Sequence, residues 1–294
     1  MSIKQFKALV AASQYGSFSA AAEMLHLTQS AVSMQVNALE QSLGTPLFDR
    51  SHRPLRLTES GQIVLTKARE ILRHYDGIQD ALSETQPYSG VFRLGAVPTT
   101  LTNILPRTVM LLTEREPRLT LNVISGLSGA LAEQVRKGEL DAALISEPTS
   151  LQNDLDWQPV TRQKIVIVAP PDSTERDAHE VFGAHPYIRF NRGAWAAPLI
   201  ESRLEEMGIS MDTRAEIESI ESICMMVAAG FGASIIPDTG MRMSFAPSLR
   251  VLEFGAPPTF RTIGLLSRSD MQKENARAKI HGALTNAVAF PVEG

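Results

Sequence analysis

The hydrophobic pattern changes its period near residue 90, and this change divides the chain into two unlike parts. Before it, apolar residues recur every three or four positions, as they do in amphipathic helices. After it, short apolar runs such as 91–97 and 119–125 alternate with helical stretches, the order of an α/β fold with parallel strands and right-handed crossovers. The 294 residues are enough for a small helical domain and a larger α/β part, and 44% of them are apolar, which suits a globular chain.

The N-terminal part predicts three helices in the order of a helix-turn-helix. Gly16 ends the first helix, and Ser17 or Ser19 can cap a short second one. Thr28 can cap a third helix, which ends at Gly44. This arrangement places two short helices and a tight turn directly before a longer helix.

The outer face of the third predicted helix carries amides and hydroxyls, whereas its apolar stripe begins at Val32. Amides and hydroxyls can pair with adenine edges and with phosphates in a DNA major groove. An ordinary solvated surface is the alternative, but the helix-turn-helix order favours a recognition surface. The residues predicted to contact DNA from this helix are Thr28, Gln29, Ser30, Ser33, Met34 and Asn37.

A cluster of basic residues follows the third helix, around Pro54. Two short extended pieces joined there would form a wing whose arginines reach phosphate or a narrow minor groove, although a solvated run of charges is the alternative. Residues 1–75 hold eight Lys or Arg against five acids, a net charge of +3 in a chain whose total is -4. Only this part therefore suits a nucleic-acid partner. The wing residues predicted to contact DNA are Arg50, His52, Arg53 and Arg56.

At these residues the N-terminal part resembles the LysR-type transcriptional regulators, in a dense match over about sixty residues. Met34 is a departure, because many members of the family carry a basic residue there. The residues that carry the resemblance are Phe18, Ala21, Ala22, Leu25, Thr28, Gln29, Ser30, Ala31, Val32, Ser33, Gln35, Leu39, Glu40, Leu43, Gly44, Leu47, Phe48, Arg50, Leu57, Thr58 and Gly61.

One long helix is predicted from Thr58 to Gln86, with a hinge at 85–90. An apolar stripe with spacings of four and three runs along it, as in a coiled-coil seam, and the alternative is that it packs on its own domain. LysR-type proteins dimerise through such a helix, so the resemblance implies a dimer or a tetramer. The predicted seam residues are Val64, Ala68, Ile71, Tyr75, Ile78 and Leu82.

In the α/β part, polar residues that follow predicted strands are candidates for a ligand cleft. Strand ends and helix N-termini of two lobes would face a ligand there and would suit an anion, with Arg192 as its counter-charge. The resemblance implies the same two-lobed fold, similar to type 2 periplasmic solute-binding proteins. Singly, each candidate is better explained as a cap or turn residue. The candidates are Thr99, Thr100, Ser125, Ser128, Ser146, Asn191 and Arg192.

Two residues with reactive side chains have simple interpretations. His26 fits the turn before the third helix, because His tolerates a positive φ and no second ligand stands at metal-binding spacing. Cys224, the only cysteine, lies in an apolar stretch and is interpreted as a small buried hydrophobe. No disulfide, metal or cofactor is expected.

Two other classes of protein are alternatives. An enzyme is disfavoured, because the sequence holds no GxSxG, HExxH, GxxxxGK or GxGxxG motif. A solute-binding protein with an N-terminal extension would bind a ligand without DNA and would survive deletion of residues 1–86. The lack of a signal sequence and of a membrane-spanning apolar run favours the cytoplasm.

The predicted organisation is an α plus α/β chain in three segments. These are a winged helix-turn-helix over residues 1–58, a linker and dimerisation helix over 59–87, and a two-lobed effector-binding domain over 88–294. The expected partners are double-stranded DNA with a two-fold-symmetric operator, a small-molecule effector, further copies of the chain, and RNA polymerase. No membrane contact is expected.

Overall fold

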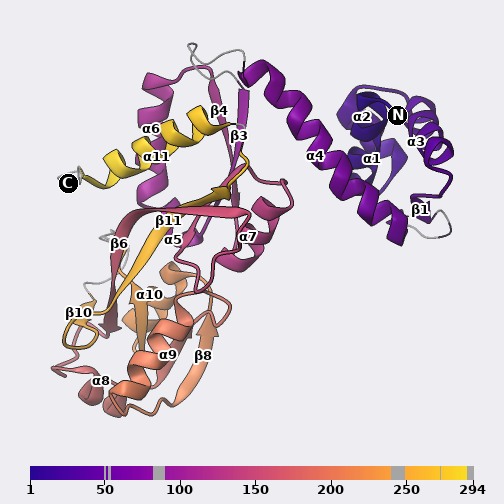
Figure 1. Ribbon diagram of the computed structural model, residues 1–294. Helices are drawn as coiled ribbons and strands as arrows, with labels where there is room; N and C mark the ends of the chain where they lie inside the picture. Colours follow the sequence, from indigo (N-terminus) through magenta and orange to yellow (C-terminus); the bar gives the residue numbers. More distant parts are fainter. Residues whose placement is uncertain (50, 52–53, 82–89, 240–248, 272, 290–294) are drawn as a thin grey trace. The chain divides into compact units, whose positions relative to one another are not determined.

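The chain folds as two compact units, residues 1–86 and 87–294. The computed structural model describes residues 1–49, 51, 54–81, 90–239, 249–271 and 273–289 (Figure 1). Within these residues, no helix combines the length and the apolar character that a bilayer crossing requires. The described residues also hold no group of three or more His, Cys, Asp or Glu side chains placed to bind a metal ion.

The first unit consists of four helices and a two-stranded antiparallel sheet. Its helices share one apolar core, in which Leu9, Val32 and Leu39 are fully buried. The strands pair Phe48 with Leu57. The elements are α1 (Ile3–Tyr15), α2 (Phe18–Leu25), α3 (Gln29–Leu43), β1 (Phe48–Asp49), β2 (Arg56–Leu57) and α4 (Glu59–Ala81).

The second unit is built on a nine-stranded sheet with the order β4-β3-β5-β11-β6-β9-β7-β8, and β10 pairs with β6 beside this path. Its strands are β3 (Gly90–Ala96), β4 (Leu119–Ser125), β5 (Ala142–Ser146), β6 (Leu155–Ala169), β7 (Tyr187–Phe190), β8 (Thr213–Ile217), β9 (Ala233–Pro237), β10 (Arg250–Glu253) and β11 (Phe260–Arg268). Its helices are α5 (Pro98–Leu101), α6 (Ile104–Arg115), α7 (Ser128–Arg136), α8 (Ala178–Ala184), α9 (Ala197–Glu206), α10 (Ile220–Ala228) and α11 (Glu274–Ala289).

Two long strands join the two lobes of this unit. Residues 155–164 of β6 pair with β11, and the following residues of β6 pair with β9 and β10. The first lobe therefore consists of residues 90–163 and 260–289, and the second lobe is residues 164–259. Parallel pairing is found within each lobe. In the first lobe β3 pairs with β4 and β5, and in the second lobe β7 pairs with β8 and β9. The strands that connect the lobes are antiparallel to their neighbours.

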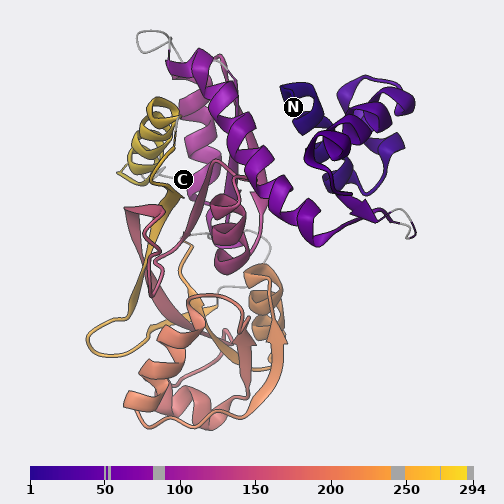
Figure 2. The same ribbon diagram turned by 45° about the vertical axis from the view of Figure 1, so that its right-hand side comes forward.

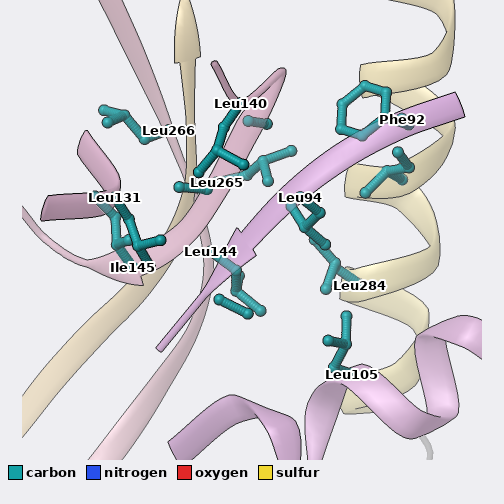
Figure 3. Packing of buried hydrophobic residues seen from close by; sticks show 14 of the residues in the cluster. Phe92, Leu94, Leu105, Leu131, Leu140, Leu144, Ile145, Leu265, Leu266 and Leu284 are labelled. Atoms are coloured by element: carbon teal, nitrogen blue, oxygen red, sulfur yellow. The ribbon is translucent and has the colours of Figure 1, made fainter. Parts of the chain in front are cut away.

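The core of the first lobe lies between its strands and the helices that cover them. Leu94 of β3, Leu144 of β5 and Leu265 of β11 meet Leu105 of α6 and Leu284 of α11 (Figure 3). Helices α6 and α11 lie side by side in both views of the ribbon (Figures 1 and 2). This packing holds the two chain segments of the first lobe together.

In the second lobe, alternate residues of β6 enter different cores. Ile165 and Ile167 pack with α8 and α9, whereas Val166 and Val168 pack with α10. A strand covered on both faces is a continuous apolar run in the sequence, and residues 165–169 form such a run.

Most predicted elements agree with the observed ones. Some observed elements have no predicted counterpart, namely the first ten residues of β6, the short helix α5, the helix α8 and the strand β10. The long linker helix is observed as α4, and the predicted continuation beyond Ala81 lies outside the described residues.

Candidate functional sites

The turn between α2 and α3 has the geometry that the sequence predicts. Ser17 caps α2, with its Oγ accepting from the Ala20 N–H at 3.1 Å. Thr28 caps α3, with its Oγ1 accepting from the Ala31 N–H at 3.2 Å. His26 has a φ of 54°, in the left-handed region, where it ends α2. The turn prediction for His26 is therefore confirmed.

The polar face of α3 is open in the first unit. Gln29, Ser30 and Met34 are exposed, and Met34 exposes 63% of its surface. Ser33 and Asn37 are half-buried beside them. The Thr28 and Ser30 hydroxyls lie 3.0 Å apart, so their hydrogen-bonding groups form one small cluster.

The one charged side chain of α3, Glu40, accepts hydrogen bonds within its own unit. Glu40 is the only charged residue of the helix, and its Oε1 accepts from the Leu47 N–H at 2.7 Å and from the Phe48 N–H at 3.3 Å. These bonds attach the start of β1 to α3. The exposed face of α3 therefore presents amide, hydroxyl and thioether groups without a competing carboxylate.

The predicted wing exists as the β1–β2 hairpin. The Leu55 N–H donates to the Gly16 carbonyl at 2.9 Å, which ties the hairpin to the turn between α1 and α2. Arg56 is exposed on β2. Arg50, His52 and Arg53 lie outside the described residues.

The predicted seam on α4 divides between two environments. Ala68 is fully buried in the core of its own unit, so it is not available to a partner helix and its place in the seam is corrected. Val64 is half-buried against the same core. Ile71 and Tyr75 are 41% and 49% exposed. The Ile78 side chain and Leu82 lie outside the described part of the chain.

A cavity of about 210 Å³ lies between the two lobes of the second unit. Residues after β3, β4 and β5 of the first lobe and after β7 and β8 of the second lobe meet there, as the sequence predicts for strand ends. Five predicted residues line it: Thr99, Ser125, Ser128, Ser146 and Asn191. The other lining residues are Val97, Pro98, Gly126, Leu127, Phe190, Ala194, Trp195, Glu218 and Arg261.

Arg261, which the sequence analysis missed, brings a positive charge into this cavity. It is 7% exposed. Its Nη2 donates to Thr99 Oγ1 at 2.6 Å and to Gln163 Oε1 at 2.6 Å, and its Nη1 lies 3.5 Å from Ser146 Oγ. All three partners are neutral. Burial lowers the pKa of the guanidinium to about 9.

Two predicted cleft residues do not line the cavity. The Thr100 hydroxyl donates to the Val97 carbonyl at 2.8 Å, so this side chain has the local role that its position also allowed. Arg192 is largely exposed, and its Nε pairs with Glu216 at 3.5 Å. Arg192 is therefore not the counter-charge of this cleft, and the prediction is wrong in this respect.

Trp195 also lines a second cavity, of about 250 Å³. Its cation, Arg136, pairs with Glu133 at 2.6 Å, and this hydrogen bond lowers the pKa of Glu133 to about 2. Arg261 has no such carboxylate among the described residues. In the cavity between the lobes, Arg261 is thus a buried cation that no carboxylate of the described residues pairs with.

A signal for Arg261 was present in the sequence. Side chains two apart on a strand share a face, and Arg261 precedes Ile263 and Leu265, which are both buried. An arginine on the buried face of a strand indicates a function. Its partner Thr99 is distant in sequence, so the sequence alone does not identify the cavity.

Both units match known families. Residues 3–62 match the family described as bacterial regulatory helix-turn-helix protein, lysR family, and residues 85–286 match the LysR substrate binding domain. A probable hydrogen peroxide-inducible genes activator of Mycobacterium leprae is 30% identical over 91% of this chain and 88% of its own. A probable RuBisCO transcriptional regulator of Cyanidioschyzon merolae is 32% identical over 75% of this chain and 76% of its own.

Solved structures show the same architecture. A full-length OxyR variant from Pseudomonas aeruginosa has a TM-score of 0.80 at 25% identity, over 97% of this chain and 94% of that one. Full-length CbnR, solved in complex with its target DNA, has a TM-score of 0.65 at 19% identity, over 98% of this chain and 100% of that one, which shows the fold. The chain therefore belongs to the LysR family of bacterial transcriptional regulators, with an N-terminal DNA-binding domain and a C-terminal effector-binding domain.

Proposed function

We propose that this regulator binds a small anion at Arg261 and that this binding changes how α3 and the β1–β2 hairpin engage DNA. The observation that carries the proposal is the buried guanidinium, which faces a cavity and has only neutral partners. A buried charge without an opposite charge is costly, and an anionic ligand removes that cost. Arg261 therefore favours ligands with a carboxylate or a similar group.

The position of Arg261 supports the coupling. It lies opposite Gln163, at the point where β6 and β11 pass between the lobes. A ligand held there and by second-lobe residues binds more tightly when the lobes are close together. It can therefore shift the balance between open and closed forms, by its difference in affinity for the two.

On DNA, we propose that α3 enters the major groove. Gln29, Ser33 and Asn37 are assigned to base edges or phosphates, and Arg56 with the basic residues of the hairpin to the backbone. A dimer through α4 would read a two-fold-symmetric operator. RNA polymerase remains a predicted partner, and the cytoplasm remains the predicted location. We also propose that the cleft binds its ligand without converting it chemically.

The DNA part is tested by recovering genomic fragments with the purified protein at low and raised salt. Gln29→Ala should lose a discrete two-fold-symmetric motif that the unchanged protein recovers. Gln152→Ala removes an exposed glutamine of the second unit and serves as the matched control. Sequence-independent recovery by the unchanged protein would contradict a specific operator.

The anion part is tested by thermal unfolding with a panel of small carboxylates and their neutral amides. At a hundredfold excess over Kd, binding adds about 2.7 kcal/mol of stability, or about 5 to 10 °C in Tm. We expect carboxylates to raise the Tm, amides to have little effect, and Arg261→Gln to abolish the response. A carboxylate that stabilises Arg261→Gln equally would contradict the assignment.

A further inference from the structure

The cleft carries one charge of each sign, on different lobes. Among the described residues that line it, Arg261 is the only cation and Glu218 the only anion. Glu218 follows β8 in the second lobe and is exposed, whereas Arg261 belongs to β11 and is buried. The cavity therefore has a positive end and a negative end.

The two charges do not neutralise each other. Arg261 donates to Thr99, Ser146 and Gln163, and burial alone lowers the pKa of its guanidinium. Glu218 forms no ion pair with the described residues. The neighbouring acid Glu216, by contrast, accepts from the Arg192 N–H at 3.0 Å and pairs with the Arg192 side chain.

The size and walls of the cavity limit what can span these charges. Its volume of about 210 Å³ corresponds to about seven water molecules at about 30 Å³ each. The cavity is lined by the aromatic side chains of Phe190 and Trp195 and by the aliphatic side chains of Val97 and Leu127. The space suits a compact molecule with a short apolar body.

The lobes approach each other closely beside this space. A Cβ at Gly193 of the second lobe would lie 3.0 Å from Leu127 Cδ1 of the first lobe. A Cβ at Gly129 of the first lobe would lie 3.4 Å from Trp195 Nε1 of the second lobe. A ligand in the cavity is therefore within reach of both lobes.

We propose that the effector is a zwitterion of the amino-acid type, with its carboxylate at Arg261 and its ammonium group at Glu218. This inference rests on the proposed function and makes it more specific. A ligand with both charges joins the two lobes, so it stabilises the closed form more than an anion that contacts Arg261 alone. Recognition of both ends also favours a zwitterion over a simple carboxylate, which contacts Arg261 but gains nothing from Glu218.

The test is calorimetric titration of the full-length protein with the common L-amino acids and the linear ω-amino acids, each beside its deaminated acid. We expect at least one amino compound to bind about three- to tenfold more tightly than its deaminated acid. Glu218→Gln should remove this difference and leave the affinity of the deaminated acid unchanged. Glu216→Gln, whose carboxylate belongs to the Arg192 pair, is the matched control and should change neither affinity.

Reversing the charge at Glu218 should create binding of a new ligand, and a misfolded protein could not show such a gain. Glu218→Lys should prefer a dicarboxylate to the ω-amino acid of the same length, the reverse of the unchanged protein. Arg261→Lys keeps the charge and should retain carboxylate binding, which controls for the fold if Arg261→Gln is unstable.

The outcomes separate this inference from the proposed function. If carboxylates bind through Arg261 equally well with and without an amino group, the zwitterion is wrong and the anion site stands. If no carboxylate binds in either form, both are wrong. If the amino compound keeps its advantage in Glu218→Gln, its ammonium group is bound elsewhere and the assignment of Glu218 is overturned.

Discussion

At the residue scale, His26 lies in the turn before α3 in a backbone conformation that few side chains adopt. Its φ of 54° is the only positive φ of a non-glycine residue among those described. His26→Gly should keep or slightly raise the free energy of unfolding, because glycine adopts this region without strain, whereas His26→Ala should lower it by up to about 1 kcal/mol, because alanine keeps the Cβ and tolerates a positive φ less well than histidine. Urea unfolding of the three proteins measures the difference. Equal losses in both variants would show that the imidazole, rather than the backbone, is needed.

Cys224 gives a prediction that depends on pH. Burial raises the pKa of its thiol to about 11 from an ordinary value near 9. At pH 8 the thiolate fraction is then about a hundredfold lower than in the unfolded chain, so iodoacetamide should alkylate the native protein at least about a hundredfold more slowly. Mass spectrometry with and without urea measures both rates.

The same shift also affects stability. A neutral thiol is favoured in the folded state, so its contribution is complete below pH 9 and is lost as the pH rises toward 11. Equal alkylation rates in native and unfolded protein would contradict the burial of Cys224.

The candidate cleft shows what residue patterns do and do not reveal. Thr99, Ser128 and Ser146 were found because polar residues after strands collect at one edge of a sheet. Arg192 was chosen for the same reason, but local pairing with Glu216 holds it outside. Arg261 was missed because it lies inside a strand, and its burial depends on partners far away in the sequence.

At the element scale, the exposed part of α4 predicts a contact between copies of the chain. Ile71 and Tyr75 are exposed on this 23-residue helix. The Lys7 Nζ lies 5.8 Å from the centroid of the Tyr75 ring, a cation–π contact that helps to orient the ring. Ile71→Asp and Tyr75→Asp should each raise the Kd of dimerisation at least about tenfold, because each places a charge in an apolar contact.

Sedimentation equilibrium measures this effect. Thr66→Asp adds the same charge to an exposed position of α4 that lies outside the predicted seam, and it should leave the Kd unchanged. Unaltered dimers in both Ile71→Asp and Tyr75→Asp would show that this face of α4 is not the interface.

The first part of β6 escaped sequence reasoning for a physical reason. The first part of β6 contains polar residues and Pro159, so it lacks the apolar alternation of a strand. Its structure comes from antiparallel pairing with β11, about a hundred residues later in the chain. There Trp157 packs over Gly264, where a Cβ would lie 2.4 Å from the indole. Contacts between strands so far apart in the sequence cannot be predicted from a short stretch of residues.

At the scale of the whole molecule, effector and operator should act on each other by the same factor. If an anion in the cleft changes the affinity for operator DNA tenfold, the operator must change the affinity for that anion tenfold in the same direction. Calorimetric titration of the anion into free protein and into the protein–DNA complex measures one factor, and DNA binding with and without the anion measures the other. An identical anion affinity in both states would contradict coupling between the sites.

The general architecture was predictable because each of its parts has its own hydrophobic period. Helical spacing before residue 90 and alternating strands and helices after it correspond to the two observed units. The antiparallel direction of the strands that join the lobes was not predicted, because no local pattern distinguishes them from the parallel strands on either side.

The second lobe leaves and rejoins the first through neighbouring strands, with Gln163 opposite Arg261 at the junction. A segment whose two ends already meet can be replaced as a block while the surrounding chain keeps its fold. In evolutionary terms, a new effector could then be acquired by exchanging residues 164–259, which supply Phe190, Trp195 and Glu218 to the cleft. If Arg261 binds an anion as proposed, such an exchange would keep this residue and its partners Thr99 and Ser146, so related proteins would share the anionic group of the ligand and differ in the rest of it.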